Sequence, residues 1–151
     1  MSEIKDARLQ KANSLVTKGF ASYAESFRVS HTRKFLIQKF GYLENGQEKD
    51  FSISIAGRVM AKRVMGKIAF FTISDQEGQI QLYLDKRIIN FNLENQKLLS
   101  FEDIKEIVDI GDWIGVYGTI KKTNKGELSI KVEKWEMLSK SLQPLPDKWH
   151  G

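Results

Sequence analysis

The strongest constraint on the fold is a two-residue alternation of apolar and polar side chains that begins near residue 51. In its first run, the apolar positions on one side are Phe51, Ile53, Ile55 and Val59. The alternate positions, on the other side, are Ser52, Ser54, Ala56, Arg58, Met60 and Lys62. Because successive side chains of a β-strand point to opposite faces of a sheet, this pattern predicts a strand with one buried face and one exposed face.

Two more strands with the same alternation are predicted at 68–74 and 79–84. Their buried positions are Ala69, Phe71, Ile73, Ile80, Leu82 and Leu84. Their exposed positions are Phe70, Thr72, Gln79, Gln81 and Tyr83. The sequence DQEG lies between them, and its final residue, Gly78, can supply the positive φ that a hairpin turn needs.

A helix and two further strands complete the predicted domain. The helix begins at Ser100, because Ser100 and Asp103 resemble a capping box in which Asp replaces the usual Glu or Gln. The strands are expected at 113–121 and 127–135. Three strands, a helix and two strands is the order of a five-stranded OB-fold β-barrel, a mainly β fold with helices. An SH3-like barrel would not need this helix, and an immunoglobulin-like sandwich would need more strands.

Residues 1–48 are predicted to form a helical extension in front of the barrel. One helix is expected at 4–16, and a shorter one at about 32–40 that is capped near Ser30 and ended by Gly41.

The predicted barrel occupies 49–140, and 141–151 form a linker beyond it. The segment 86–99 is rich in Asn and Lys and has only scattered apolar residues, so no element is assigned to it. A chain of 151 residues is long enough for about one domain with a substantial core.

Composition narrows the class of protein. The content of 41% hydrophobic and 28% charged residues is typical of a soluble globular domain, and the absence of cysteine excludes disulfides and thiolate metal sites. The net charge of +5 favours a polyanionic partner, and basic residues cluster at 58–67 and at 121–125, with no acidic residue inside either cluster. The apolar runs are too short to span a membrane, and the N-terminus lacks the apolar core of a secretory signal, so we expect a cytoplasmic protein with no membrane partner.

The exposed face of the first hairpin carries side chains that suit a single-stranded nucleic acid. Phe70 is the most informative, because Phe71 takes the buried position and an exposed phenylalanine ring is costly unless something covers it. A base stacked on such a ring contributes about 1–3 kcal/mol to binding. The alternative is that Phe70 packs against the N-terminal helices or a neighbouring domain.

The other outward side chains are candidates for base edges and phosphates. Tyr83 can stack, Gln81 can pair with a base in two directions, and Glu127 can accept hydrogen bonds from base amino or imino groups. The basic candidates for phosphate contact are Arg58, Lys62, Arg63 and Lys67. Each basic residue, taken alone, is equally consistent with a role in solubility or a surface salt bridge. Gln81 or Glu127, taken alone, is better explained as an ordinary solvated strand residue.

No catalytic or metal site is predicted. His31 lies at a helix start and His150 near the chain end, and neither has partners that suggest nucleophilic or metal chemistry. The sequence has no GxxxxGK[ST] phosphate loop. A binding module is therefore expected.

Two long runs of the sequence are GRVMAKRVMGKIAFFTISDQEGQIQLYL and GDWIGVYGTIKKTNKGELSIKVEKWEMLSKSLQPLPDKWHG. They resemble the N-terminal anticodon-binding domain of class II lysyl-tRNA synthetases, and the likeness covers essentially the whole chain. The resemblance implies a domain that reads a U-rich anticodon, with the central uracil stacked on Phe70. It also implies base contacts from Arg58, Gln81 and Glu127.

The same resemblance implies a parent enzyme, a homodimeric lysine–tRNA ligase whose catalytic domain binds ATP, magnesium and lysine. That domain is expected to begin just after Gly151, so we expect this chain to be a non-catalytic segment of a longer ligase, with no cofactor of its own. Its expected partner is the anticodon loop of lysine tRNA. The alternative is a stand-alone OB-fold module that binds single strands or proteins without any ligase.

Overall fold

The computed structural model of the chain describes residues 27–93 and 99–141. The predicted helix at 4–16 and most of the predicted linker at 141–151 lie outside the described residues. The proposed domain limits at residues 48 and 140 stay a prediction. Within the described part of the chain, no helix is both long enough and apolar enough to cross a membrane.

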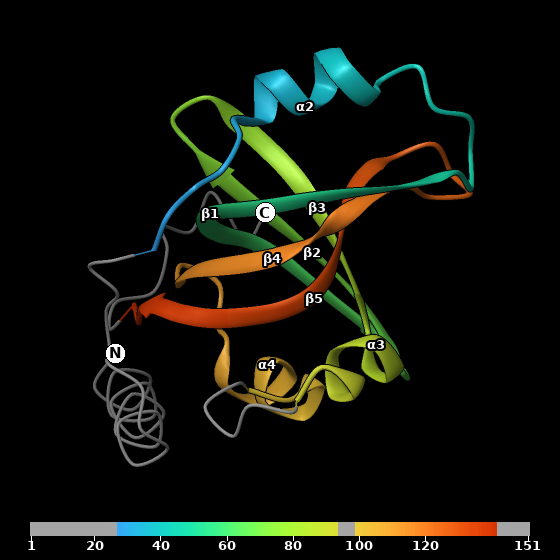
Figure 1. The fold of residues 1–151 in the computed structure, drawn as a ribbon. Coiled ribbons are helices and arrows are strands. Elements are labelled where there is room, and N and C mark those ends of the chain that lie inside the picture. The colour runs from blue at the N-terminus through green and yellow to red at the C-terminus, as the bar shows by residue number, and fades with distance from the viewer. Residues whose placement is uncertain (1–26, 94–98, 142–151) are drawn as a thin grey trace.

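Five strands form a closed barrel in the order β1-β2-β3-β5-β4 (Figure 1). Their bounds are β1 Glu48–Met65, β2 Ile68–Asp75, β3 Gly78–Asp85, β4 Trp113–Lys122 and β5 Leu128–Ser139. All neighbouring strands are antiparallel except β3 and β5, which pair in parallel and close the barrel. The prediction of a five-stranded OB-fold barrel is confirmed.

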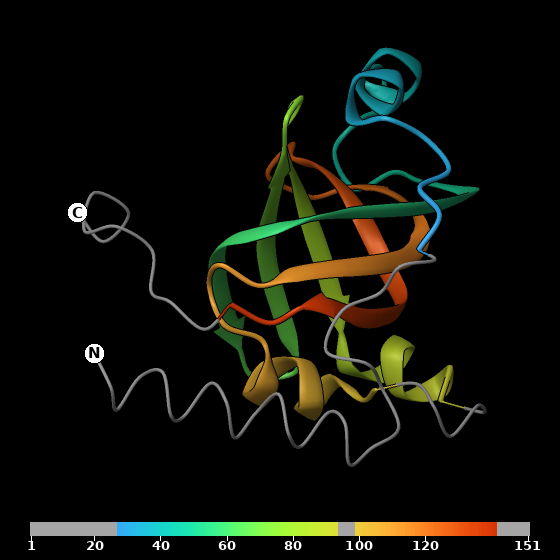
Figure 2. The ribbon, with the colours of Figure 1, turned by 90° about the vertical axis from the view of Figure 1, so that its left-hand side faces the viewer.

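Within residues 27–93 and 99–141, three helices flank the barrel, namely α2 Arg33–Phe40, α3 Lys86–Phe91 and α4 Phe101–Ile107. The two views show α2 beyond one end of the barrel and α3 with α4 beyond the other (Figures 1 and 2). The capping box predicted for α4 is confirmed, because Asp103 N–H donates to Ser100 Oγ at 3.1 Å and Ser100 N–H donates to Asp103 Oδ2 at 3.2 Å. α4 thus lies between β3 and β4 in the chain, as predicted.

The cap predicted for α2 near Ser30 is wrong. Thr32 caps this helix, and its Oγ1 accepts from Phe35 N–H at 3.1 Å. Ser30 instead bonds to β1. Its N–H donates to Ser54 O at 2.8 Å, and its hydroxyl accepts from Ser54 N–H at 2.9 Å.

Helix α3 lies in the segment to which the sequence assigned no element. It follows β3 directly, because Asp85 ends that strand and also caps the helix by accepting from Arg87 N–H at 2.9 Å. Its buried residue, Ile89, joins the core near α4.

The alternation predicts the barrel core correctly as far as Val59. The apolar positions predicted to be buried in β2 and β3 are all buried, as are Ile53, Ile55 and Val59 of β1. Helix α4 contributes Phe101 and Ile104 to the same core cluster. The alternation therefore assigns the inner and outer faces of β2 and β3 correctly.

A β-bulge in β1 reverses the alternation after Val59. Val59 pairs with Ile73, but the next paired residue, Ala61, pairs with Thr72, so β1 has one extra residue at this point. Residues directly opposite each other in a sheet share a face. Lys62, opposite Phe71, is therefore on the inner face, and Arg63, opposite Phe70, is on the outer face. The prediction that Lys62 shares a face with Arg58 is wrong.

Candidate nucleic-acid interface

A row of aromatic and basic side chains crosses the outer face of the barrel. Phe70 on β2 lies opposite Arg63 on β1 and Tyr83 on β3, and Tyr83 lies opposite Lys131 on β5. The Phe70 and Tyr83 rings meet edge to face, with centroids 5.7 Å apart and planes at 65°. The Arg63 guanidinium carbon is 5.0 Å from the Phe70 centroid. Phe70 is half-buried, so its neighbours orient the ring and leave part of it accessible.

A second row, next to the first, orients the amide of Gln81. Gln81 pairs with Ser129 on β5, and its Nε2 donates to Ser129 Oγ at 3.0 Å. Ser129 is fully buried, and its own hydroxyl donates a second hydrogen bond to Glu127 O at 3.2 Å. One N–H of the amide is used in this way, while the side chain has a second N–H and an acceptor oxygen for a base edge.

The turn between β4 and β5 places Glu127 at the rim of this face. Thr123 N–H donates to Glu127 O at 3.0 Å, and Glu127 N–H donates to Thr123 Oγ1 at 3.1 Å. The turn is completed by Gly126, whose φ of +90° favours glycine. Glu127 is exposed and lies just before β5, which begins at Leu128. The turn thus presents a carboxylate beside Gln81 and Phe70.

These side chains surround a groove of about 450 Å³. The predicted site residues that line it are Arg63, Phe70, Gln81, Tyr83 and Glu127. The residues that the prediction missed are Met65, Lys121, Thr123, Asn124 and Lys125. Four of these five lie in the β4–β5 turn or next to it. The basic cluster at 121–125 is the sequence signal that could have pointed to them.

Three predicted site residues do not line the groove. Arg58 pairs with Ser74 and Trp113, and its Nε donates to Gly111 O at 3.3 Å. Lys67 is exposed in the turn between β1 and β2. Lys62 is turned toward the helical end of the barrel, so its predicted place beside the other phosphate contacts is wrong.

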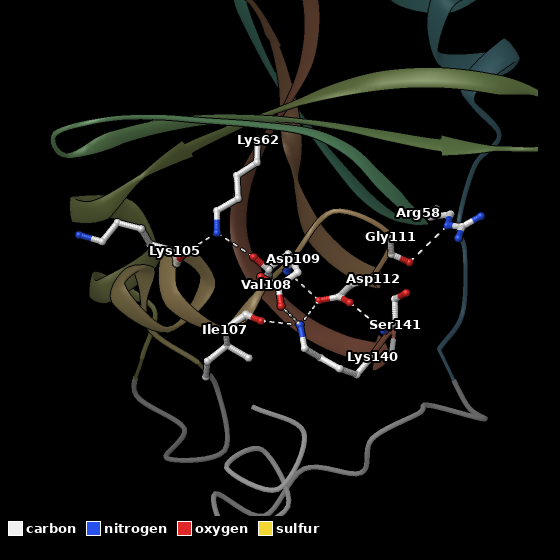
Figure 3. A network of polar contacts seen from close by, with 10 residues as sticks. All are labelled: Arg58, Lys62, Lys105, Ile107, Val108, Asp109, Gly111, Asp112, Lys140 and Ser141. Atoms are coloured by element: carbon white, nitrogen blue, oxygen red, sulfur yellow. Dashed lines mark hydrogen bonds and ion pairs between the residues drawn. The ribbon is translucent and has the colours of Figure 1, made fainter. Parts of the chain in front are cut away.

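Lys62 binds the C-terminal end of α4 and the residue after it. Its Nζ donates to Lys105 O at 2.5 Å and to Val108 O at 2.7 Å (Figure 3). These carbonyls belong to the negative end of the helix, where an ammonium group is favourable. Lys62 also lies 5.9 Å from the centroid of the buried Phe71 ring. Its ammonium group therefore connects β1 to α4.

A buried ion cluster supports the same region. Lys140 Nζ is 2.7 Å from Ile107 O, 2.8 Å from Asp109 Oδ2 and in contact with Asp112 Oδ2 (Figure 3). Asp112 also accepts from Ser141 N–H at 2.8 Å. Burial raises the pKa of the Asp112 carboxyl, and the charge of Lys140 opposes that rise. The cluster anchors the loop that follows α4.

That loop holds the bulge in place. Val59 N–H donates to Asp112 O at 2.8 Å, and Gly111 N–H donates to Val59 O at 2.8 Å. The loop therefore forms hydrogen bonds with the N–H and the C=O of Val59, the residue of β1 that directly precedes the bulge. Through this contact the buried cluster supports the strand that carries Arg63.

Comparison with known proteins agrees with this geometry. Residues 53–138 match the tRNA anti-codon family, described as an OB-fold nucleic acid binding domain. The chain is 93% identical over its full length to a lysine–tRNA ligase of Prochlorococcus marinus strain MIT 9312, and 52% identical to one of Synechococcus sp. strain RCC307. It spans only 30% and 28% of those two relatives. The barrel, its groove and this match together show that the chain belongs to the tRNA anti-codon family of OB-fold nucleic acid binding domains.

Proposed function

We propose that this chain is the anticodon-reading module of a lysine–tRNA ligase and that its groove binds the U-rich anticodon of lysine tRNA. The observation that carries the proposal is the row of Arg63, Phe70 and Tyr83 across the groove. The names of the relatives support the choice of lysine tRNA.

In the proposed complex, the central uracil stacks on the accessible part of Phe70. Gln81 and Glu127 then meet its edge. Uracil offers an N3–H donor to a carboxylate and carbonyl oxygens to an amide N–H, whereas cytosine has an acceptor at N3. Arg63 extends the stack or pairs with an adjacent phosphate.

The proposed parent protein is a cytoplasmic, homodimeric ligase that uses ATP and Mg²⁺ to attach lysine to its tRNA. We assign ATP, Mg²⁺ and lysine to the remainder of that ligase and no step of the reaction to this chain. Among residues 27–93 and 99–141, no group of three or more His, Asp or Glu side chains could hold a metal ion. In this proposal, the described residues contribute recognition of the tRNA.

The stacking role is tested by comparing Phe70→Ala with Phe91→Ala. Both variants remove a phenylalanine ring, but Phe91 is 79% exposed on α3 and does not line the groove. Phe70→Ala is expected to weaken binding to an anticodon stem-loop bearing UUU by about 1–3 kcal/mol, and Phe91→Ala to leave it unchanged. Fluorescence anisotropy measures the affinity, and circular dichroism verifies the fold. Unchanged affinity in Phe70→Ala would exclude the stacking role.

Specificity is tested on the RNA. Replacing the central uridine by cytidine is expected to cost far more affinity than changing the sequence of the stem. Equal binding to a C-rich loop would contradict anticodon reading and favour the alternative, a generic single-strand binding module.

A further inference from the structure

An ion-paired cluster lies at one end of the groove, beside Tyr83. The carboxylate of Glu48, the first residue of β1, bridges one lysine of β4 and one lysine of β5. Its Oε2 is 3.0 Å from Lys121 Nζ on β4, and its Oε1 is 2.6 Å from Lys131 Nζ on β5. One carboxylate thus holds two ammonium groups.

Both lysines belong to the same face as the stacking rings. Lys131 lies directly opposite Tyr83, and Lys121 lies opposite Ser129, the residue that orients Gln81. Lys121 also lines the groove, and its Nζ is 5.1 Å from the centroid of the Tyr83 ring. A strand that stacks on this face would bring its backbone close to these ammonium groups.

The solvent-exposed fractions of the three side chains indicate that Glu48 is the one most easily displaced. The side chain of Glu48 is 42% exposed, whereas those of Lys121 and Lys131 are 18% and 25% exposed. The two lysine side chains are thus less exposed than the carboxylate that bridges them. A carboxylate that moves away regains hydration, and an exposed ion pair contributes little to stability. Replacement of the carboxylate by another anion therefore costs little.

We propose that Lys121 and Lys131 form a phosphate subsite for single-stranded RNA and that the carboxylate of Glu48 occupies this subsite until RNA displaces it. This proposal rests on RNA binding in the groove. A phosphodiester resembles a carboxylate in having two anionic oxygens that can bridge two ammonium groups. The hydrogen bond from Lys131, followed by the contacts with Lys121, lowers the pKa of Glu48, so the bridging anion is charged at neutral pH.

The displaced carboxylate makes binding selective. Any polyanion must first compete with Glu48 for the two lysines, so a strand that offers phosphate alone gains little. A strand that also stacks on Phe70 and Tyr83 brings enough additional contact to displace it. Removing the carboxylate is therefore expected to strengthen the binding of all single strands and to reduce the discrimination between them.

The test is Glu48→Gln, with Glu44→Gln as the matched control. Both variants remove one negative charge, but Glu44 is an exposed residue of the loop before β1. Glu48→Gln is expected to raise the affinity for a UUU stem-loop by about 2- to 30-fold, since RNA no longer has to break two ion pairs, each worth about 0.2–1 kcal/mol. Glu44→Gln is expected to change it by much less. Fluorescence anisotropy at two salt concentrations measures both.

A second substitution locates the effect. In the Glu48→Gln background, Lys121→Gln or Lys131→Gln is expected to abolish the gain in affinity and to make the salt dependence of binding shallower. An unchanged or weaker affinity in Glu48→Gln, with an unchanged melting temperature, would overturn the proposal. A lower melting temperature with weaker binding would assign Glu48 to barrel stability alone and would also overturn it.

The same measurements separate this proposal from the proposed function. If the parent chain binds UUU and C-rich loops equally but Glu48→Gln strengthens both, the phosphate subsite stands and anticodon reading fails. If UUU is preferred and Glu48→Gln has no effect, anticodon reading stands and the subsite fails. If neither protein binds any RNA, both proposals fail.

Discussion

At the scale of single residues, two arginines of the same strand have different roles. Arg58 precedes the bulge and donates to Gly111 O, whereas Arg63 follows it and lies over Phe70. Both arginines are on the outer face, because Arg58 lies opposite Ser74 and Arg63 lies opposite Phe70, but only the extra residue in β1 brings Arg63 to that face. Arg63 is therefore the arginine that can act on RNA in the groove.

Arg63→Ala and Arg58→Ala test this assignment, since both remove the same charge from the same strand. Arg63→Ala is expected to weaken RNA binding by about 1–2 kcal/mol, through the loss of a cation over the stack or of a phosphate contact. Arg58→Ala is expected to have a much smaller effect. Isothermal titration with the UUU stem-loop measures both, and a larger loss in Arg58→Ala would contradict the placement.

At the scale of elements, α4 and the loop after it hold the bulged part of β1. Lys62 links β1 to the carbonyls at the end of α4, and the backbone of the loop bonds to Val59. Lys140 and Asp112 anchor that loop in turn. A helix that covers one end of the barrel thereby supports the strand that forms one side of the groove.

Lys62→Ala and Lys67→Ala test this connection. Lys62→Ala leaves two carbonyls without a charged donor, so the free energy of unfolding is expected to fall by about 1–2 kcal/mol. Lys67 is exposed, and Lys67→Ala is expected to change it by less than about 0.5 kcal/mol. Urea denaturation measures both. Unchanged stability in Lys62→Ala would show that the link contributes nothing.

The sequence predicts much of this arrangement, but not the bulge. The two-residue alternation of apolar and polar side chains predicts which residues of β2 and β3 face outward. It therefore predicts that Phe70, Gln81 and Tyr83 are on the outer face. The bulge follows from backbone bonds between Val59 and residues more than fifty positions away, and no glycine marks it. The prediction placed Lys62 on the wrong face for this reason. Helix α3 was missed because it has only six residues and shares Asp85 with β3.

At the scale of the whole molecule, the carboxyl group of Glu136 gives the folded state a stability contribution that depends on pH. Glu136 lies on β5, beside Tyr117 of β4. Burial raises the pKa of Glu136 above its ordinary value of 4.5, and a hydrogen bond with the Tyr117 side chain partly offsets the rise. Just above pH 4.5, Glu136 therefore holds its proton more often in the folded chain than in the unfolded chain. The contribution of this group to stability falls as the pH rises through that window.

Glu136→Gln removes this dependence and keeps the shape of the side chain. The variant is expected to be more stable than the parent at pH 7 and to differ less from it at pH 4. Urea denaturation at the two pH values measures the difference, with Glu133→Gln on the same strand as a control. A variant that is less stable than the parent at pH 7 would contradict the assigned cause.

The parallel pairing of β3 with β5 has a consequence for the order of folding. The bond between Gln81 and Ser129 joins residues 48 positions apart, whereas Phe70 and Tyr83 meet within one hairpin. Contacts between distant residues form late, because a long loop must close first. A chain that is still being synthesised can therefore assemble the stacking rings early. It acquires the oriented Gln81 amide and Lys131 only when β5 docks. RNA that contacts both halves would favour the docked state over the open one, so binding and the final step of folding are coupled.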